Sequence, residues 1–106
     1  MFNLFSRTKE YEDLGGVDFK TKYNAAKGIL VDVRTPGEFQ AGSIRGARNI
    51  DFMSVSFMDR FTQLDKNKEY FLFCRSGARS GNACRMLSRE GYKVYNLSGG
   101  IGAWPE

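Results

Sequence analysis

Short apolar runs alternate along the chain with stretches that repeat at helical spacing. Ile29–Val33 and Tyr70–Phe73 are apolar at almost every position, which is typical of strands buried on both faces of a parallel sheet. Lys93–Leu97 alternates in part and predicts a third strand. Two shorter runs, Tyr11–Leu14 and Ala47–Ile50, predict two more strands.

Helical segments fill the intervals between these strands. Asp18–Ala26 predicts a helix capped by Asp18 or a neighbour, and Val55–Leu64 predicts another. The apolar face of the second helix would carry Phe57, Met58, Phe61 and Leu64. Thr35–Glu38 has the capping-box form, with Thr as N-cap, Pro at the first helical position and Glu at the third. Alternating strands and helices predict an α/β fold, a mostly parallel five-stranded sheet that is doubly wound, with helices on both faces.

A cysteine loop follows the strand at 70–73 directly. Its residues are Cys74, Arg75, Ser76, Gly77, Ala78, Arg79 and Ser80. A helix comes next, with Ser80, Ala83, Cys84 and Leu87 on one face, and it ends at Gly91. The thiol therefore lies at the carboxyl end of a central strand, where open α/β sheets bind ligands. Gly77 allows a tight turn in which backbone N–H groups point inward as an anion-binding nest.

The surroundings of Cys74 predict a reactive thiolate. A cysteine after a buried strand is more often a core residue, but a glycine and two arginines in the next five positions favour a nucleophile. A helix N-terminus and the cations Arg75 and Arg79 are expected to lower the thiol pKa toward neutrality. The 106 residues include no histidine, which excludes a Cys–His dyad. The reaction is then one that a preformed thiolate performs alone, either transfer of a sulfur atom or attack on an oxyanion ester.

Three motifs occur in order along the chain. Asp32–Ile50 contains D-V-R, E-F and G-S-I-R-G-A-R-N-I, Cys74–Arg79 forms the cysteine loop, and Leu97–Trp104 reads L-S-G-G-I-G-A-W. Together they resemble the signatures of the rhodanese-like sulfurtransferase family, whose six-residue active-site loop Cys74–Arg79 is similar to. The resemblance covers about Tyr11 to Trp104, and Ser43 stands where family members commonly have His.

The resemblance implies the same parallel-sheet fold and a sulfurtransferase activity. Cys74 would attack the outer sulfur of a donor such as thiosulfate, hold it as a persulfide, and pass it to cyanide or a thiol. The loop N–H groups from Arg75 to Ser80 would stabilise the anionic sulfur. Arg75 and Arg79 would attract and orient the anionic donor.

Two other functions stay open. Phosphatases and arsenate reductases also place a catalytic cysteine in an anion-binding loop, and their arginine lies six positions after the cysteine. Here Arg79 follows Cys74 by five. The shorter loop encloses a narrower anion-binding site, which suits a sulfur atom better than a tetrahedral oxyanion. A non-catalytic recognition module is the third function, and it has no need of a thiolate.

The remaining chemical groups favour structural roles. Asp32 and Arg34 predict an ion pair at a strand end, and Glu38 predicts a helix cap rather than an acid–base catalyst. Arg79 is expected to brace the loop through a carboxylate such as Asp32 or Glu38. Cys84 lies on the core face of its helix and is expected to pack rather than to resolve an oxidised Cys74.

The glycine-rich end of the chain does not fit a dinucleotide loop. Pro105 stands where the third glycine of G-x-G-x-x-G belongs, so Gly99–Ala103 predicts a tight turn into a last helical turn that Trp104 anchors. No metal-ligand spacing occurs, and neither a metal nor another cofactor is expected.

Composition fits one domain over residues 1–106, with a short N-terminal extension at 1–10. A net charge of +4 without alternating basic and aromatic residues argues against nucleic acid as a partner. Met1–Phe5 is too short for a signal peptide, and no apolar run reaches the ~20 residues of a membrane span. Two cysteines make no disulfide scaffold, so we expect a cytoplasmic protein. We also expect a monomer whose partners are a small anionic sulfur donor and a thiol or protein acceptor.

Overall fold

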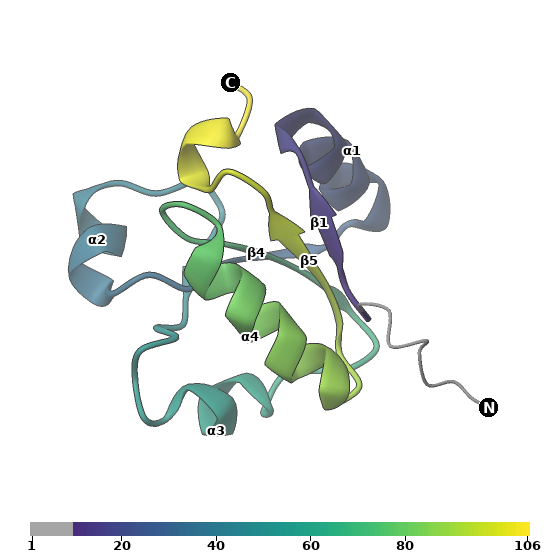
Figure 1. Cartoon of the computed structure of the whole chain (residues 1–106), viewed down its shortest axis with the longest axis vertical. Coiled ribbons are helices and arrows are strands. Elements are labelled where there is room, and N and C mark those ends of the chain that lie inside the picture. Colours follow the sequence, from purple (N-terminus) through teal and green to yellow (C-terminus); the bar gives the residue numbers. More distant parts are fainter. Residues whose placement is uncertain (1–9) are drawn as a thin grey trace.

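Five parallel strands form one sheet in the order β1-β5-β4-β2-β3 (Figure 1). This computed structural model describes residues 10–106, so the extension expected at 1–10, apart from Glu10, lies outside the described residues. The strands are β1 (Glu12–Leu14), β2 (Ile29–Asp32), β3 (Arg48–Asn49), β4 (Glu69–Phe73) and β5 (Lys93–Leu97). The predicted parallel α/β sheet is confirmed.

Helices cover both faces of the sheet, as the alternating pattern predicted. They are α1 (Gly16–Ala26), α2 (Pro36–Ala41), α3 (Phe57–Phe61), α4 (Ala78–Arg89) and the 3-10 turn η2 (Ile101–Ala103). In Figure 1, α4 crosses the face of the sheet that is turned toward the viewer, and α1 lies behind β1. Among residues 10–106, no helix has the length and apolar character needed to cross a membrane.

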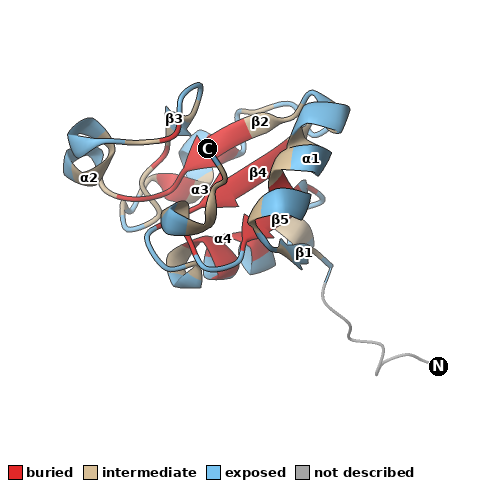
Figure 2. Ribbon diagram, turned by 90° about the horizontal axis from the view of Figure 1, so that it is seen from above, coloured by how far each residue is buried: buried red, intermediate tan, exposed pale blue. Residues whose placement is uncertain are grey.

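The central strand β4 divides its side chains between two cores. Tyr70 and Leu72 pack in the cluster that α3 and α4 cover, whereas Phe71 and Phe73 pack in the cluster that α1 covers. All four side chains are almost completely buried, and Figure 2 shows β2, β4 and β5 as mostly buried strands between more exposed helices. This alternation explains why the strand is apolar at successive positions.

Local hydrogen bonds shorten one predicted helix. The helix expected at 55–64 is reduced to α3, Phe57–Phe61. Before it, the Ser54 hydroxyl accepts from the Ser56 N–H at 3.1 Å, which gives the backbone an alternative to a helical turn. After it, the N–H of Leu64 donates to the carbonyl of Phe61 three residues back, so the helix ends in a tighter turn.

Two further predictions need correction. Asp18 does not cap α1: the helix begins at Gly16 with Gly15 as N-cap, and Asp18 lies in the first turn. There its carboxylate faces the positive end of the helix dipole, which is favourable without a capping bond. The short strand expected at Ala47–Ile50 is also reduced, to the two residues of β3.

We predict that Phe71→Ala will lower the free energy of unfolding by about 3–5 kcal/mol. The substitution leaves a cavity in place of the ring, and the packed side chains around it cannot move in to fill it. The Phe71 ring is fully buried, stacks on Tyr95 at 4.5 Å between ring centroids, and meets the edge of Phe19 at 5.4 Å. Urea unfolding followed by circular dichroism measures the loss. Val55→Ala is the control, since that side chain is fully exposed and should change stability by less than about 0.5 kcal/mol. A Phe71 variant as stable as the control would contradict this account of the core.

Candidate active site

Cys74 lies at the carboxyl edge of the sheet, between the end of β4 and the start of α4. Two backbone hydrogen bonds fix the chain on either side of the thiol. The carbonyl of Phe73 accepts from the N–H of Val33 at 3.0 Å, and the carbonyl of Cys74 accepts from the N–H of Ile101 at 2.8 Å. The cysteine is therefore held between β2 and the turn that follows β5.

The Cys74 sulfur accepts hydrogen bonds from the first turn of α4 and the residue before it. The Gly77 N–H lies 3.1 Å from the sulfur, and the Ser80 N–H and hydroxyl each lie 3.4 Å from it. Such an array of donors favours the thiolate over the thiol. Backbone N–H groups of the loop thus point inward at the sulfur, and the Ser80 hydroxyl adds one more donor.

Burial and hydrogen bonding act in opposite directions on this thiol. Burial raises the pKa of Cys74, but the hydrogen bonds from the Ser80 hydroxyl and from the N–H groups of Ser80, Gly77 and Ser76 outweigh it. The pKa of Cys74 is therefore lowered from its ordinary value. Of the two expected causes, the N–H groups at the start of α4 lower this pKa together with one hydroxyl, and the arginines are not among its main causes.

Two glycines allow the loop to close on the sulfur. Gly77 has a φ of 99°, and a Cβ there would stand 3.2 Å from the carbonyl oxygen of Leu97. Gly100 has a φ of 79°, and a Cβ there would collide with the carbonyl group of Arg75. Side chains at these two positions would push the cysteine loop away from the turn after β5. Gly77 and Gly100 therefore allow the cysteine loop to pack closely against the turn after β5.

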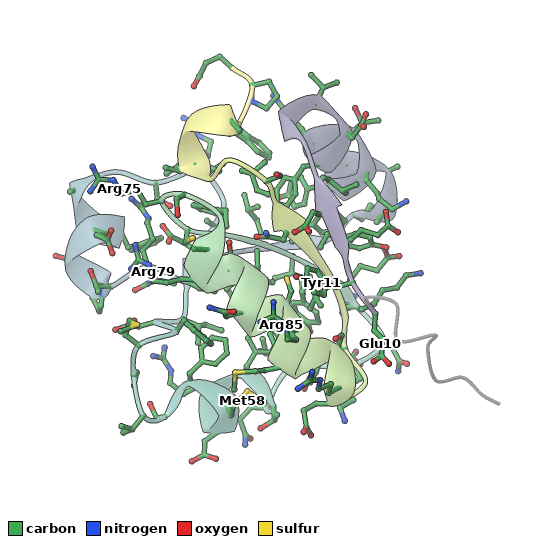
Figure 3. All side chains as sticks on the ribbon, in the orientation of Figure 1. Glu10, Tyr11, Met58, Arg75, Arg79 and Arg85 are labelled. Carbon is green, nitrogen blue, oxygen red and sulfur yellow. The ribbon has the colours of Figure 1, made fainter. Side chains whose placement is uncertain are left out.

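Arg79 braces the loop against α2. Its guanidinium donates to both carboxylate oxygens of Glu38, at 2.8 and 3.0 Å, and Figure 3 shows Arg79 on the side of α4 that faces α2. Glu38 also closes the capping box with Thr35. The hydrogen bond from Arg79, followed by that from the Thr35 N–H, lowers the pKa of Glu38 to about 2. Of the two carboxylates considered for Arg79, the structure selects Glu38.

The predicted pair of Asp32 and Arg34 is present and is structural. Their closest atoms, Oδ2 and Nη2, lie 2.8 Å apart, and both residues are buried. Nη2 also donates to the carbonyl of Gly42 at 2.6 Å, and the Ser43 hydroxyl donates to Asp32 at 2.7 Å. Ser43 therefore makes a hydrogen bond within this cluster, and the cluster ties the end of β2 to the segment after α2.

Arg75 lies on the outer surface of the loop. Its side chain is exposed and has no hydrogen bond or ion pair with any of residues 10–106 in the structure, whereas Cys74 is completely buried. Figure 3 places Arg75 at the α2 side of the loop, where its charge is available to a ligand. Ser76 and Ala78 are exposed as well, so the loop presents its outer surface to solvent and its N–H groups to the sulfur.

Cys84 takes the packing position that its helical face predicted. The side chain is completely buried, and burial raises the pKa of its thiol well above the ordinary value. No group of three or more His, Cys, Asp or Glu residues within the described part of the chain is placed to hold a metal ion. Cys74 is thus the cysteine whose surroundings favour ionisation.

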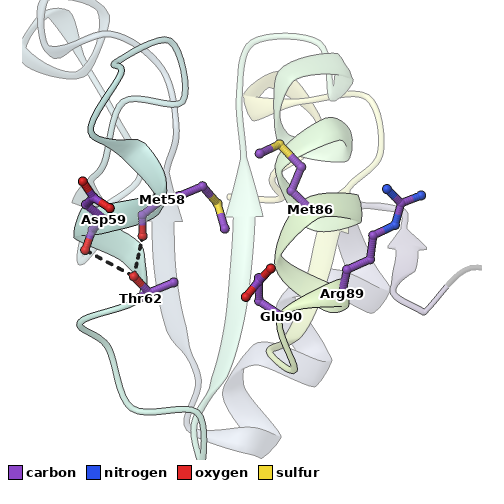
Figure 4. A pocket seen from close by; sticks show the side chains of 6 residues that line it. All are labelled: Met58, Asp59, Thr62, Met86, Arg89 and Glu90. Carbon is purple, nitrogen blue, oxygen red and sulfur yellow. Dashed lines mark hydrogen bonds between the residues drawn. The ribbon is translucent and has the colours of Figure 1, made fainter.

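A surface groove between α3 and α4 lies away from this site. It is lined by Met58, Asp59, Thr62, Met86, Arg89 and Glu90 (Figure 4). The Thr62 hydroxyl is already used within its own helix, where it donates to the carbonyl of Met58 at 2.7 Å. Met86 stands eight residues after the start of α4, or about 12 Å along the helix axis. The groove therefore contributes nothing to the chemistry at Cys74.

Comparison with known proteins gives a consistent set of relatives. The Rhodanese-like domain family matches residues 17–106. A sulfurtransferase of Allochromatium vinosum is 42% identical over 77 residues, which cover 72% of this chain and 70% of that protein. The thiosulfate sulfurtransferase PspE of Escherichia coli is 34% identical over 71 residues, covering 67% of this chain and 68% of that one. The crystal structure of a rhodanese-like domain protein from Staphylococcus aureus superposes with a TM-score of 0.77 at 29% identity, covering 90% of this chain and 92% of that chain.

The contact between Glu38 and Arg79 predicts a pH-dependent stability. The pKa of Glu38 is lowered from 4.5 to about 2, so its contribution is complete above pH 4.5 and is lost as the pH falls toward 2. Because the Glu38 side chain is 30% exposed, solvent screening holds the contribution to about 1 kcal/mol or less. Urea unfolding at several pH values should show that Glu38→Gln removes this part of the acid sensitivity.

Arg79→Met tests the same pair from the other side. It removes the partner rather than the carboxylate, and should weaken the acid sensitivity in the same window. If both variants lost stability between pH 4.5 and 2 as steeply as the native protein, the ion pair would not be its source.

Proposed function

Because the chain belongs to the rhodanese-like family, we propose that it is a sulfurtransferase that forms a persulfide on Cys74. The donor is thiosulfate or a similar small anion, and the acceptor is cyanide or a thiol, free or on a protein. One observation carries the proposal: the Cys74 sulfur accepts hydrogen bonds from the N–H of Gly77 and from the N–H and hydroxyl of Ser80. These hydrogen bonds favour the thiolate, the form of the sulfur that attacks a donor.

The reaction consists of two displacements at sulfur. The Cys74 thiolate attacks the outer sulfur of thiosulfate, a sulfur–sulfur bond forms to Cys74, and the bond to the sulfite sulfur breaks with its electron pair leaving on sulfite. The acceptor then attacks the terminal sulfur of the persulfide, and the electron pair of that bond returns to Cys74 as thiolate. With cyanide ion or a thiolate as the acceptor, neither displacement moves a proton, so the chemistry suits a chain that contains no histidine.

The carboxylates near the loop support sulfur transfer over phosphate hydrolysis. Hydrolysis of a phosphate monoester needs a general acid for the leaving oxygen. Asp32 is committed to Arg34, and Glu38 is committed to Arg79 and Thr35. A low pKa keeps Glu38 ionised and unable to donate a proton near neutrality. Displacement at sulfur needs no such group.

The exposed positive charge of Arg75 would attract the anionic donor. The Arg79 guanidinium already interacts with anionic groups of the protein: Glu38 raises its pKa most, and the Cys74 thiolate raises it further. Arg75 is exposed at the outer surface of the loop. A dianion such as thiosulfate would approach the guanidinium of Arg75, whose geometry suits an oxyanion.

We predict that Cys74→Ala will abolish sulfur transfer and persulfide formation, whereas Cys84→Ala will retain most of both. Intact mass spectrometry after incubation with thiosulfate should show one added sulfur atom in the native chain and in Cys84→Ala only. Turnover of thiosulfate with cyanide should follow the same pattern. Absence of the added sulfur in the native chain, or hydrolysis of p-nitrophenyl phosphate that disappears with Cys74, would contradict the proposal.

Arg75→Ala should raise KM for thiosulfate without changing the titration of the thiol. Removing an exposed cation costs about 1 kcal/mol, which corresponds to about fivefold in affinity. The effect should shrink as salt is added, since the charge is open to screening. Arg85→Ala is the control: Arg85 is an exposed arginine on α4 that bonds Asn82, and its removal should leave KM unchanged. Equal KM values for the two variants would remove Arg75 from the binding of the donor.

A further inference from the structure

Asn96 is a polar residue that is buried among mostly apolar side chains. It lies in β5, where Val94, Tyr95 and Leu97 are buried side chains of the two cores, and it is itself 4% exposed. Within the described residues, its Oδ1 atom is buried without a hydrogen-bond partner. Such an atom costs about 1–3 kcal/mol, and an apolar side chain here would avoid the cost. A gain elsewhere must explain an asparagine at this position.

The other end of the amide reaches the cysteine loop. Nδ2 donates to the carbonyl of Gly77 at 3.2 Å and to the carboxylate of Asp13 at 2.9 Å. Both partners are acceptors, so only the NH₂ group can face them, and this fixes which way the amide points. Asp13 lies directly opposite Asn96 in the pairing of β1 with β5. The carboxylate therefore orients the amide that holds Gly77.

Gly77 connects this contact to the sulfur. Its carbonyl accepts from Asn96 and from the N–H of Gly81 at 3.0 Å, while its own N–H donates to Cys74 at 3.1 Å. Gly81 also fits closely, since a Cβ there would stand 3.3 Å from Nδ2 of Asn96. A glycine in the left-handed region has wide conformational freedom, and two donors on its carbonyl restrict that freedom.

We infer that Asn96 is a positioning residue of the active site, which anchors Gly77 so that its N–H points at the Cys74 sulfur, with Asp13 setting the orientation of the amide. The inference deepens the proposed function and rests on it for its catalytic meaning. Asn96 touches neither donor nor acceptor, and it acts through the backbone of the loop. The unpaired Oδ1 of Asn96 has an energetic cost, and the hydrogen bond from its Nδ2 to Gly77 keeps in place an N–H donor that stabilises the thiolate.

The test is the pH dependence of Cys74 alkylation by iodoacetamide, measured in a Cys84→Ala background so that one thiol reacts. Because Cys74 is buried, the loop must open before the thiol reacts. This opening lowers the alkylation rate by the same factor at every pH, so the midpoint of the pH profile still reports the ionisation of the thiol. Asn96→Leu removes both donors at similar volume. We expect its midpoint to rise by about one pH unit, which is about a tenfold smaller ionisation constant of the thiol. A folded Asn96→Leu protein with an unchanged midpoint would overturn the inference.

Asn49→Leu is the matched control. Like the Asn96 amide, the Asn49 amide donates two hydrogen bonds, but its acceptors are the backbone carbonyls of Asp32 and Arg34, at 2.9 Å each, and neither belongs to the cysteine loop. We expect this variant to lose stability in urea and to keep the native midpoint. A shift as large as that of Asn96→Leu would mean that loss of stability alone moves the titration, and would also overturn the inference.

A second pair of variants keeps the test decisive if Asn96→Leu does not fold. Asp13→Ala and Asp13→Asn both remove the same charge, but only Asn keeps an acceptor for the Asn96 amide. We expect the higher midpoint in Asp13→Ala, and equal midpoints would refute the orienting role of Asp13. Alkylation needs no sulfur donor, so failure of the native chain to take up sulfur from thiosulfate would contradict the proposed function separately.

Discussion

The Gly77 N–H reaches the Cys74 sulfur only because the chain turns through the left-handed region between β4 and α4. That turn depends on a close fit with the end of β5 and the segment after it, where neither Gly77 against the Leu97 carbonyl nor Gly100 against the Arg75 carbonyl has room for a side chain. The sheet sets this distance, since β4 and β5 are neighbours in register. The anion site is therefore a product of strand pairing, of two glycines, and of the helix that starts at the turn.

Charge around the site is divided between holding the loop and meeting a ligand. The carboxylates of Asp32 and Glu38 each bind an arginine in two-point contact, which fixes the segments that flank the loop. Arg75 is left over and faces outward. The fold thus separates the cation that supports the architecture from the one that is available to an anion, although both belong to the same short loop.

Much of this architecture could be predicted from the sequence because it follows from local pattern. Apolar runs predicted the strands, and the cysteine followed by glycine predicted donors around the sulfur. The predicted length of α3 was wrong because the Ser54 hydroxyl accepts a hydrogen bond from the backbone N–H of Ser56. Hydrophobic periodicity does not reveal such a contact. Asn96 and the Ser80 hydroxyl were missed because their roles depend on segments brought together by folding. The one available signal was an asparagine within a buried strand.

The complete burial of Cys74 has a consequence for regiochemistry. A cysteine persulfide offers an incoming nucleophile two electrophilic sulfurs. Attack at the inner one would expel hydrosulfide and leave the enzyme as a mixed disulfide, whereas attack at the outer one delivers the sulfur and regenerates the thiolate. If Cys74 forms the proposed persulfide, Sγ is enclosed by its own loop and a bulky acceptor would meet the outer sulfur, about 2 Å further along the bond. In the proposed reaction, enclosure of the nucleophile would therefore favour the displacement that delivers the sulfur.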